Sequence, residues 1–195
     1  MGRNTVQFRT SAPLEDIVGT TNAIKGFVRV DADDLKSNGL EAEFQVDLTD
    51  LTTGIGLRDT HMKDNDLHTA EYPRATFRLT RVLKSSASSL KPDKEVRLTA
   101  EGTFELHGVT RRIRVPVRVT RMAASEATMG RIPGNLIRVQ SEFDVRLADH
   151  NIERPSMVLL KVGEVAHITL DVFATDASPE MITAWMEKMK KMMGD

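Results

Sequence analysis

Cysteine is absent from this 195-residue chain, and tryptophan and tyrosine occur once each. Without cysteine the chain can form no disulfide scaffold, no cysteine-ligated zinc or iron–sulfur site and no thiol nucleophile. The chain also has no large excess of positive or negative charge, because 27 Lys and Arg residues nearly balance 28 Asp and Glu residues. That balance excludes a global basic surface, so no nucleic-acid partner is expected. No run approaches the ~18 apolar residues of a membrane-spanning helix.

What the sequence has instead is a strong alternation of apolar and polar residues. In residues 40–48 and 96–106 the even positions carry apolar residues or glycine, and the odd positions carry polar residues. Because successive side chains of a strand point to opposite faces, each segment is predicted to be a strand with one buried and one solvated face. Eight strands are expected, within residues 5–9, 24–31, 40–48, 75–82, 96–106, 113–119, 137–147 and 165–174.

Short amphipathic strands separated by turns are typical of an antiparallel sandwich or closed barrel, so the predicted fold class is all-β. Helical stretches are expected only at residues 56–67, between the third and fourth strands, and at residues 179–193. An outer-membrane barrel would need aromatic girdles, whereas Trp185 and Tyr72 both lie outside the strands, so no membrane span is expected. An eight-stranded barrel is either filled by side chains or holds one small ligand, and periodicity leaves both open.

Several short motifs occur in a fixed order along the chain. They are Lys25–Phe27 (KGF), Arg58–Met62 (RDTHM), Tyr72–Phe77 (YPRATF) and His107–Thr110 (HGVT). Over residues 4–174 this series resembles the YceI-like family of lipid- and polyisoprenoid-binding proteins. The resemblance implies an extended eight-stranded lipocalin-like antiparallel barrel with a long apolar tunnel. It also implies that the tunnel holds an isoprenoid or fatty-acyl lipid, with no catalysis and no cofactor.

The same resemblance bears on location, because members of the family are commonly exported by bacteria. It implies a periplasmic or secreted protein. Residues Met1–Thr10 carry neither the basic start nor the roughly 7–15-residue apolar core of a secretory signal. A cytoplasmic location therefore stays open beside the exported one.

The predicted function is non-catalytic binding, carriage or storage of one elongated apolar lipid in the barrel interior. Six apolar residues on the strands are expected to line the tunnel, namely Phe44, Phe77, Leu79, Phe104, Phe143 and Val145. Specificity is expected to come from the length of the tunnel and from a few polar groups near its mouth.

Ionisable side chains crowd one ten-residue segment. They are Asp59, His61, Asp64, Asp66 and His68. Structural ion pairing is one interpretation, and the resemblance suggests that Arg58 and Asp59 pair and tie the helical crossover to the barrel. Contact of Arg58, Asp59 and His61 with a lipid head group is a second interpretation.

Metal binding by the Asp59–His68 cluster is the third interpretation. Only His61 with Asp64, and Asp64 with His68, have the helical i, i+3 or i+4 spacing that suits two ligands of one ion, so no metal ligand is assigned. A metal-dependent enzyme or metal-binding protein using this cluster is the alternative function. The chain contains no nucleophile elbow, phosphate loop or H-E-x-x-H motif, and no catalytic residue is assigned.

Basic residues gather on one face of another predicted strand, at Arg112, Arg114 and Arg118. Opposite charges are expected on the neighbouring outer faces, at Glu41, Glu43, Glu101 and Glu105. Opposite charges on adjacent strands attract each other, so a solvated surface paired across strands is predicted.

The last segment, residues 177–195, is predicted to be an amphipathic helix that follows a barrel of residues 1–176. Ser178 is a suitable N-cap, and Pro179 suits the first helical position. The apolar side chains fall on one arc that comprises Met181, Ile182, Trp185, Met186, Met189, Met192 and Met193. So short a helix is marginal alone in water, and this face must bury against something. The alternatives are an open end of the barrel, a second copy in a homodimer, and a membrane surface or another partner.

Overall fold

The computed structural model describes residues 4–11, 16–35, 39–125, 128, 132–153 and 163–193. Its strands are β1 (Thr5–Ser11), β2 (Asp16–Thr21), β3 (Ile24–Arg29), β4 (Glu41–Asp47), β5 (Arg74–Ser85), β6 (Glu95–Leu106), β7 (Val109–Met122), β8 (Leu136–Arg146) and β9 (Val165–Thr175). Its helical elements are α1 (Gly56–His61), the π-helical turn η1 (Met62–Asp66), the 3-10 turn η2 (Leu147–His150) and α3 (Pro179–Met193). The all-β fold class, the helical crossover and the C-terminal helix are confirmed.

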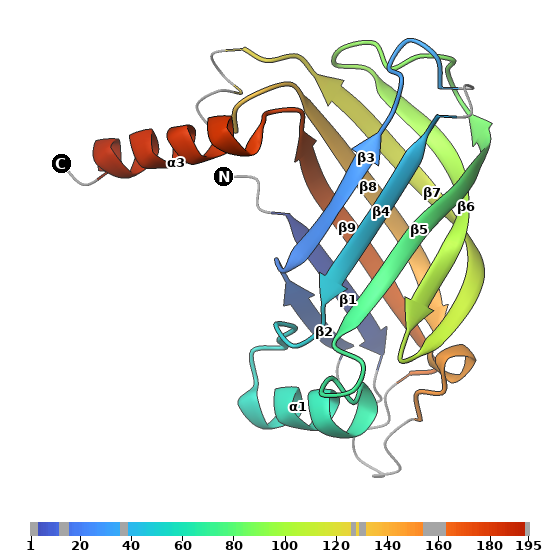
Figure 1. The fold of residues 1–195 in the computed structure, drawn as a ribbon. Helices are drawn as coiled ribbons and strands as arrows, with labels where there is room; N and C mark the ends of the chain where they lie inside the picture. Colours follow the sequence, from blue (N-terminus) through green and yellow to red (C-terminus); the bar gives the residue numbers. More distant parts are fainter. Residues whose placement is uncertain are drawn as a thin grey trace.

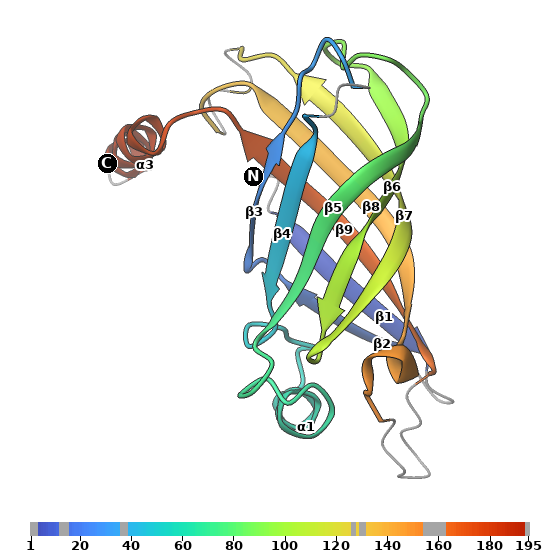
Figure 2. The same ribbon diagram turned by 45° about the vertical axis from the view of Figure 1, so that its right-hand side comes forward.

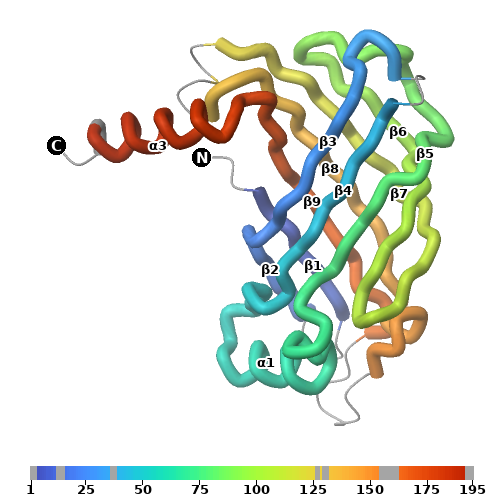
Figure 3. The backbone as a smooth tube through the Cα atoms, in the orientation of Figure 1, coloured from blue at the N-terminus to red at the C-terminus, as the bar shows by residue number. Residues whose placement is uncertain are grey.

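All these strands belong to one antiparallel sheet with the order β2-β1-β9-β8-β7-β6-β5-β4-β3. The sheet curls around a common interior to form an open barrel, which the ribbon and the tube both show (Figures 1 and 3). Its longest strands, β5 to β9, are consecutive neighbours, and β6 turns into β7 through His107 and Gly108. Both residues have a positive φ, 52° and 72°, as the tightest hairpin turns require.

The prediction of eight strands was wrong by one, because the alternation of apolar and polar residues that marks the other strands is weak in β2. Its inward positions are Ile17, Gly19 and Thr21, so only one of them carries a large apolar side chain. Gly19 lies opposite Phe8 of β1, and a Cβ atom there would lie 2.1 Å from the Phe8 ring. The phenylalanine of one strand therefore occupies the side-chain space of the next, which removes the alternation from β2.

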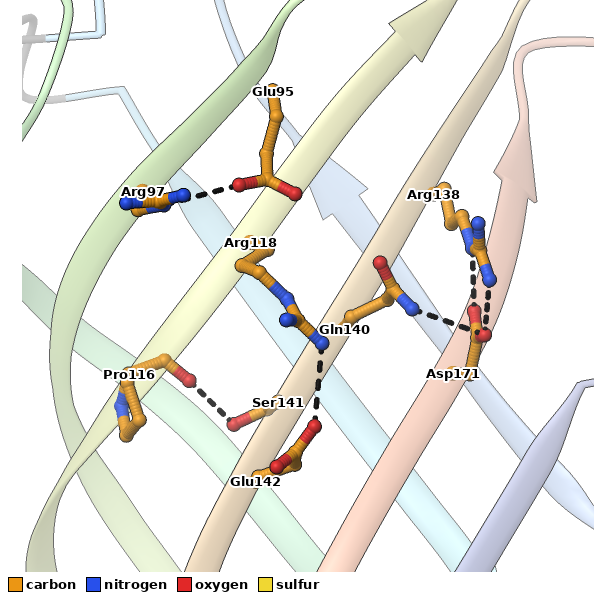
Figure 4. Close-up of polar contacts among 9 residues, drawn as sticks. All are labelled: Glu95, Arg97, Pro116, Arg118, Arg138, Gln140, Ser141, Glu142 and Asp171. Atoms are coloured by element: carbon orange, nitrogen blue, oxygen red, sulfur yellow. Dashed lines mark hydrogen bonds and ion pairs between the residues drawn. The ribbon is translucent and has the colours of Figure 1, made fainter.

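The outer face of the barrel carries ion pairs between neighbouring strands. Glu101 on β6 lies between Arg81 and Arg114, at 2.9 and 3.0 Å, and only 3% of its side chain is exposed. Figure 4 shows two further pairs, Arg118 with Glu142 and Arg138 with Asp171. The other predicted glutamates also pair, Glu41 with Arg29, and Glu43 and Glu105 with Arg78. Cross-strand pairing is thus confirmed for Arg114, Arg118 and the four predicted glutamates, whereas pairing of Arg112 stays a prediction.

The barrel has two different ends, here called the α1 end and the closed end. Elements α1, η1 and η2 lie together at the α1 end (Figures 1 and 2). At the closed end the segment after β3 bonds to the β5–β6 connection, from Leu35 N to Ser88 O (2.8 Å) and from Leu90 N to Ala32 O (2.7 Å). A buried apolar cluster fills the closed end and comprises Leu35, Leu90, Val96 and Val119. A second cluster, nearer the α1 end, comprises Leu48, Ala75, Phe104, Leu106, Val145 and Ile152.

The α3 helix has the bounds that the sequence predicted, and it extends away from the barrel after β9 (Figures 1 and 2). Met181 N donates to Ser178 Oγ at 3.3 Å, as expected of an N-cap. Within the predicted apolar arc Met181 and Met186 are exposed, and Ile182, Trp185 and Met189 are half-buried. The side chains of Met192 and Met193, and residues 194–195, lie outside the described part. Among the described helices, none has the length and apolar character needed to cross a bilayer.

Candidate functional site

The barrel encloses a cavity of about 920 Å³ whose wall receives side chains from every strand of the sheet. This volume lies near the upper end of the range for small-molecule sites, roughly 300–1,000 Å³. The wall follows directly from the alternation in the sequence, because the inward face of each strand carries its apolar residues. The register of the sheet aligns them across strands. Phe44 on β4 lies opposite Phe77 on β5, which in turn lies opposite Phe104 on β6.

All six residues predicted to line a tunnel lie on the wall of this cavity: Phe44, Phe77, Leu79, Phe104, Phe143 and Val145. They differ in how firmly they pack against protein. Phe104 is buried and meets the rings of Phe143 and His150 edge-on, with centroids 5.9 and 5.4 Å apart. Phe44, Phe77 and Leu79 are half-buried although they point inward. Their remaining surface faces the cavity and is available to a ligand.

The cavity opens at the α1 end. Among the described residues that line it, the exposed ones are Ile55, Leu57, His61, Asn65 and Glu153. The first four belong to α1, η1 and the residue before them, and Glu153 follows η2 at the same end of the barrel (Figure 2). The mouth is therefore framed by the crossover between β4 and β5. The α3 helix begins at the opposite end and does not cover this opening.

Polar side chains in the cavity wall concentrate at this mouth, at Thr53, Arg58, His61, Asn65, Asp66 and Glu153. Two hydroxyl groups lie elsewhere on the wall. Ser141 Oγ donates to the Pro116 carbonyl at 2.7 Å, so this hydroxyl group has its hydrogen-bond partner within the protein (Figure 4). Thr10 is buried, and within the described part of the chain its Oγ1 has no hydrogen-bond partner. The rest of the wall is apolar.

Arg58 and Asp59 anchor α1 to the barrel through the preceding loop. Asp59 accepts hydrogen bonds from Thr52 Oγ1 (2.5 Å) and Thr53 N (2.7 Å), and Arg58 Nε donates to Thr53 Oγ1 at 2.9 Å. Thr52 pairs in turn with Thr20 of β2. Burial opposes ionisation of Asp59, but the hydrogen bonds from Thr52 and Thr53 outweigh it and lower the pKa of Asp59. Thr53 thus bonds to both residues and links α1 to the barrel, while the direct pairing of Arg58 with Asp59 stays a prediction.

The other mouth residues mix donors and acceptors. Asn65 Nδ2 lies 3.0 Å from His61 Nδ1, one helical turn away. Burial raises the pKa of the Asp66 carboxyl group, although the nearby His61 and His68 oppose that shift. The mouth thus presents one guanidinium, one imidazole, one amide, one hydroxyl and two carboxyl groups around an apolar opening.

The ionisable cluster of residues 59–68 is dispersed over different partners. Asp59 faces Thr52 and Thr53, while His68 Nδ1 lies 2.8 Å from His107 Nε2 in the β6–β7 hairpin. Among the described residues, no three His, Asp or Glu side chains are grouped so that they could hold one metal ion. The geometry gives no support to metal chemistry at these residues.

A histidine network, which was not predicted from the sequence, links the elements at the α1 end. His107 Nδ1 lies 3.0 Å from the His150 carbonyl, and His150 Nδ1 lies 3.2 Å from the Val109 carbonyl. The Tyr72 ring meets His107 edge-on, with centroids 4.7 Å apart. With the contact between His68 and His107, these bonds join the crossover, the β6–β7 hairpin and η2. His150 is buried, and burial lowers its pKa.

A family model described as the YceI-like domain matches residues 2–174. The chain belongs to the YceI-like family. Among solved structures, Burkholderia cenocepacia BcnA has a TM-score of 0.66 at 13% identity, covering 88% of this chain and 96% of that one. A polyisoprenoid-binding domain from Saccharophagus degradans, implicated in plant cell wall breakdown, has a TM-score of 0.66 at 20% identity, with 87% and 92% covered. The Campylobacter jejuni YceI protein has a TM-score of 0.65 at 14% identity, with 86% and 90% covered. No curated protein matches the sequence.

These likenesses agree with the geometry at the level of the fold. The YceI-like match ends at Ala174, one residue before the end of β9, and leaves α3 outside it. The barrel is thus the part of the chain that the family shares.

Proposed function

We propose that this protein binds, carries or stores one elongated apolar lipid, of the isoprenoid or fatty-acyl type, inside its barrel. The observation that carries the proposal is the cavity of about 920 Å³, whose wall is apolar from the closed end to the mouth. Transfer of an apolar chain from water into such a space is favourable and needs no directional contacts. Membership of the YceI-like family supports the same function, and one structural neighbour is itself described as polyisoprenoid-binding.

We further propose that the lipid lies with its polar head at the mouth and its chain toward the closed end. Arg58, His61, Asn65 and Asp66 supply hydrogen-bonding groups at one end of the cavity only. Burying a polar head in the apolar part would leave its hydrogen bonds unmade, which is costly. In this proposal Phe44, Phe77, Leu79 and their neighbours contact the chain. No residue is assigned a catalytic, cofactor-binding or metal-binding role.

The location that we propose is the periplasm or the cell exterior, and this rests on the family alone. Cell fractionation with an antibody against the chain tests it. Recovery in the cytoplasmic fraction would contradict it.

A side chain that fills the middle of the cavity tests the binding proposal. Ala100 on β6 is buried and lines the cavity, so Ala100→Trp is expected to occupy the space of the lipid chain. Arg97 lies on the outer face of the same strand, and Arg97→Trp is the matched control. Titration with a fluorescent fatty acid should show one site per chain in the parent and in the control. We expect at least tenfold weaker binding to Ala100→Trp, with its fold checked by circular dichroism. Equal binding to all three proteins would overturn the proposal.

A further inference from the structure

The tip of the crossover at the mouth carries two exposed apolar side chains. Leu57 is the most exposed of the large apolar residues in the described chain, at 73%, and Ile55 is exposed at 51%. Both also line the cavity. Apart from chain neighbours and the backbone of α1, no atom of the described residues lies within 4 Å of where a Cβ atom on Gly54 or Gly56 would lie. Apolar surface therefore continues from the interior to solvent at one place.

The other exposed large apolar side chains do not share this property. Val18, Phe27, Val165, Met181 and Met186 are exposed, but they do not line the cavity. Phe27 lies on the outer face of the barrel, where the Arg29 guanidinium covers its ring at 5.6 Å. Among the residues that the structure describes, the combination of exposure with access to the interior thus singles out Ile55 and Leu57.

We propose that the Gly54–Leu57 tip contacts the surface of a phospholipid bilayer, where the barrel takes up or delivers its lipid. The inference rests on the proposed function, because a cargo of this class resides in bilayers and has little solubility in water. A chain that passes through water exposes its whole apolar surface, and contact between tip and bilayer shortens or removes that exposure. Insertion of a few apolar side chains at the headgroup boundary gives reversible membrane binding. A carrier needs reversible binding because it must leave the bilayer again.

Charge around the tip indicates which bilayer surface suits it. The adjoining helical segment, residues 56–66, carries Arg58 and Lys63 together with three aspartates, so it has no excess of positive charge. A polybasic patch would favour anionic lipids, and this segment has none. Binding is therefore expected to depend on apolar insertion, with little change when anionic lipid is added.

The first test needs no cargo. The full chain is floated with phosphatidylcholine vesicles and compared with the double variant Ile55→Ser/Leu57→Ser. Met181→Ser/Met186→Ser is the matched control, because each of these α3 side chains is 52% exposed, much like Ile55. We expect the tip variant to bind vesicles about tenfold less and the control to bind like the parent. Equal binding by the parent and the tip variant, or loss in the control alone, would overturn the inference.

The second test measures delivery. Protein loaded with a fluorescent fatty acid is mixed with acceptor vesicles at increasing concentration. Contact-dependent delivery predicts a transfer rate that rises with vesicle concentration in the parent and falls about tenfold in the tip variant. A parent rate independent of vesicle concentration would mean release into water and would contradict the inference. A dimer in light scattering that the tip substitutions dissociate would assign the tip to a second copy instead. If the parent takes up no fatty acid, the proposed function fails, whereas the flotation result still decides the tip.

Discussion

The two ends of the barrel are built from similar apolar residues and yet differ in exposure and polarity. At the closed end Leu35, Leu90, Val96 and Val119 are buried, and loop–loop hydrogen bonds hold the covering segments together. At the α1 end the lining includes the exposed Ile55 and Leu57, and charged groups surround the opening. The same strands continue between them, so the difference comes from the connections that cover each end. Access to the interior is thus determined by loops on a barrel whose wall is uniform.

Because of this difference, the closed end contributes mainly to folding stability and the α1 end mainly to binding. Burial of apolar surface at the closed end contributes to folding, because those side chains exchange water for protein contacts. Exposed apolar side chains at the α1 end make no such contribution, and they remain available to a ligand or a membrane.

Matched leucine substitutions at the two ends test that separation with the largest expected effect. Leu90 is 3% exposed at the closed end, whereas Leu57 is 73% exposed at the mouth. Leu90→Ala removes packed atoms and leaves a void, and we expect it to lower the free energy of unfolding by about 2–5 kcal/mol. Leu57→Ala should change it by no more than about 0.5 kcal/mol. Urea denaturation measures both free energies, and similar losses from the two substitutions would contradict the difference between the two ends.

A fall in pH should lower the stability of the folded protein through His150, which lies at the α1 end. Burial lowers the pKa of His150 in the folded protein, while the unfolded chain keeps the usual value near 6.5. Below that pH the unfolded chain binds a proton that the folded protein excludes. Stability is therefore complete above about pH 6.5 and falls as the pH drops toward the lower folded pKa, by at most about 1.4 kcal/mol per pH unit.

The variant His150→Asn should flatten this dependence between pH 7 and pH 5, as measured by denaturation at each pH. His167 is exposed on the outer face and contacts Asp144, so His167→Asn serves as the control. An unchanged slope in His150→Asn would show that another group governs the acid response of this end.

Removal of the C-terminal helix should have the smallest effect on the barrel. The α3 helix lies away from the mouth, so deletion of residues 177–195 is expected to change the free energy of unfolding by less than about 0.5 kcal/mol. The rate of lipid release should also stay the same. Light scattering then tests a homodimer through α3, one of the alternatives for its apolar face, which predicts that the deletion converts a dimer into a monomer. Faster lipid release from the truncated chain would instead favour a helix that closes the barrel.

Alternation along the chain predicted most of the barrel, since each strand with large apolar residues on one face was found where expected. It failed at β2 because Gly19 and Thr21 take inward positions and the Phe8 ring fills the space beside them. Phe27 and Phe173 alternate out of step with their apolar neighbours Val28 and Val172, so the sequence places their rings on the outer face. The structure shows both rings under arginine side chains, those of Arg29 and Arg138.

The position of the mouth could not be predicted in this way. Which end opens depends on how the connections fold back over the barrel, and periodicity within strands carries no information on that. The histidine network is similar, because His68 and His107 are 39 residues apart and meet only through the register of β5 and β6. The six wall residues were predictable because their side-chain direction follows from the strand itself.

Native mass spectrometry of the freshly purified full chain tests the central proposal most directly. From this proposal we expect the parent to carry the mass of one lipid per chain, and Ala100→Trp, purified in the same way, to carry none. The control Arg97→Trp should retain the lipid like the parent. A parent chain that remains free of lipid even after incubation with isoprenoid and fatty-acyl lipids would contradict it, as would a lipid mass that Ala100→Trp retains in full.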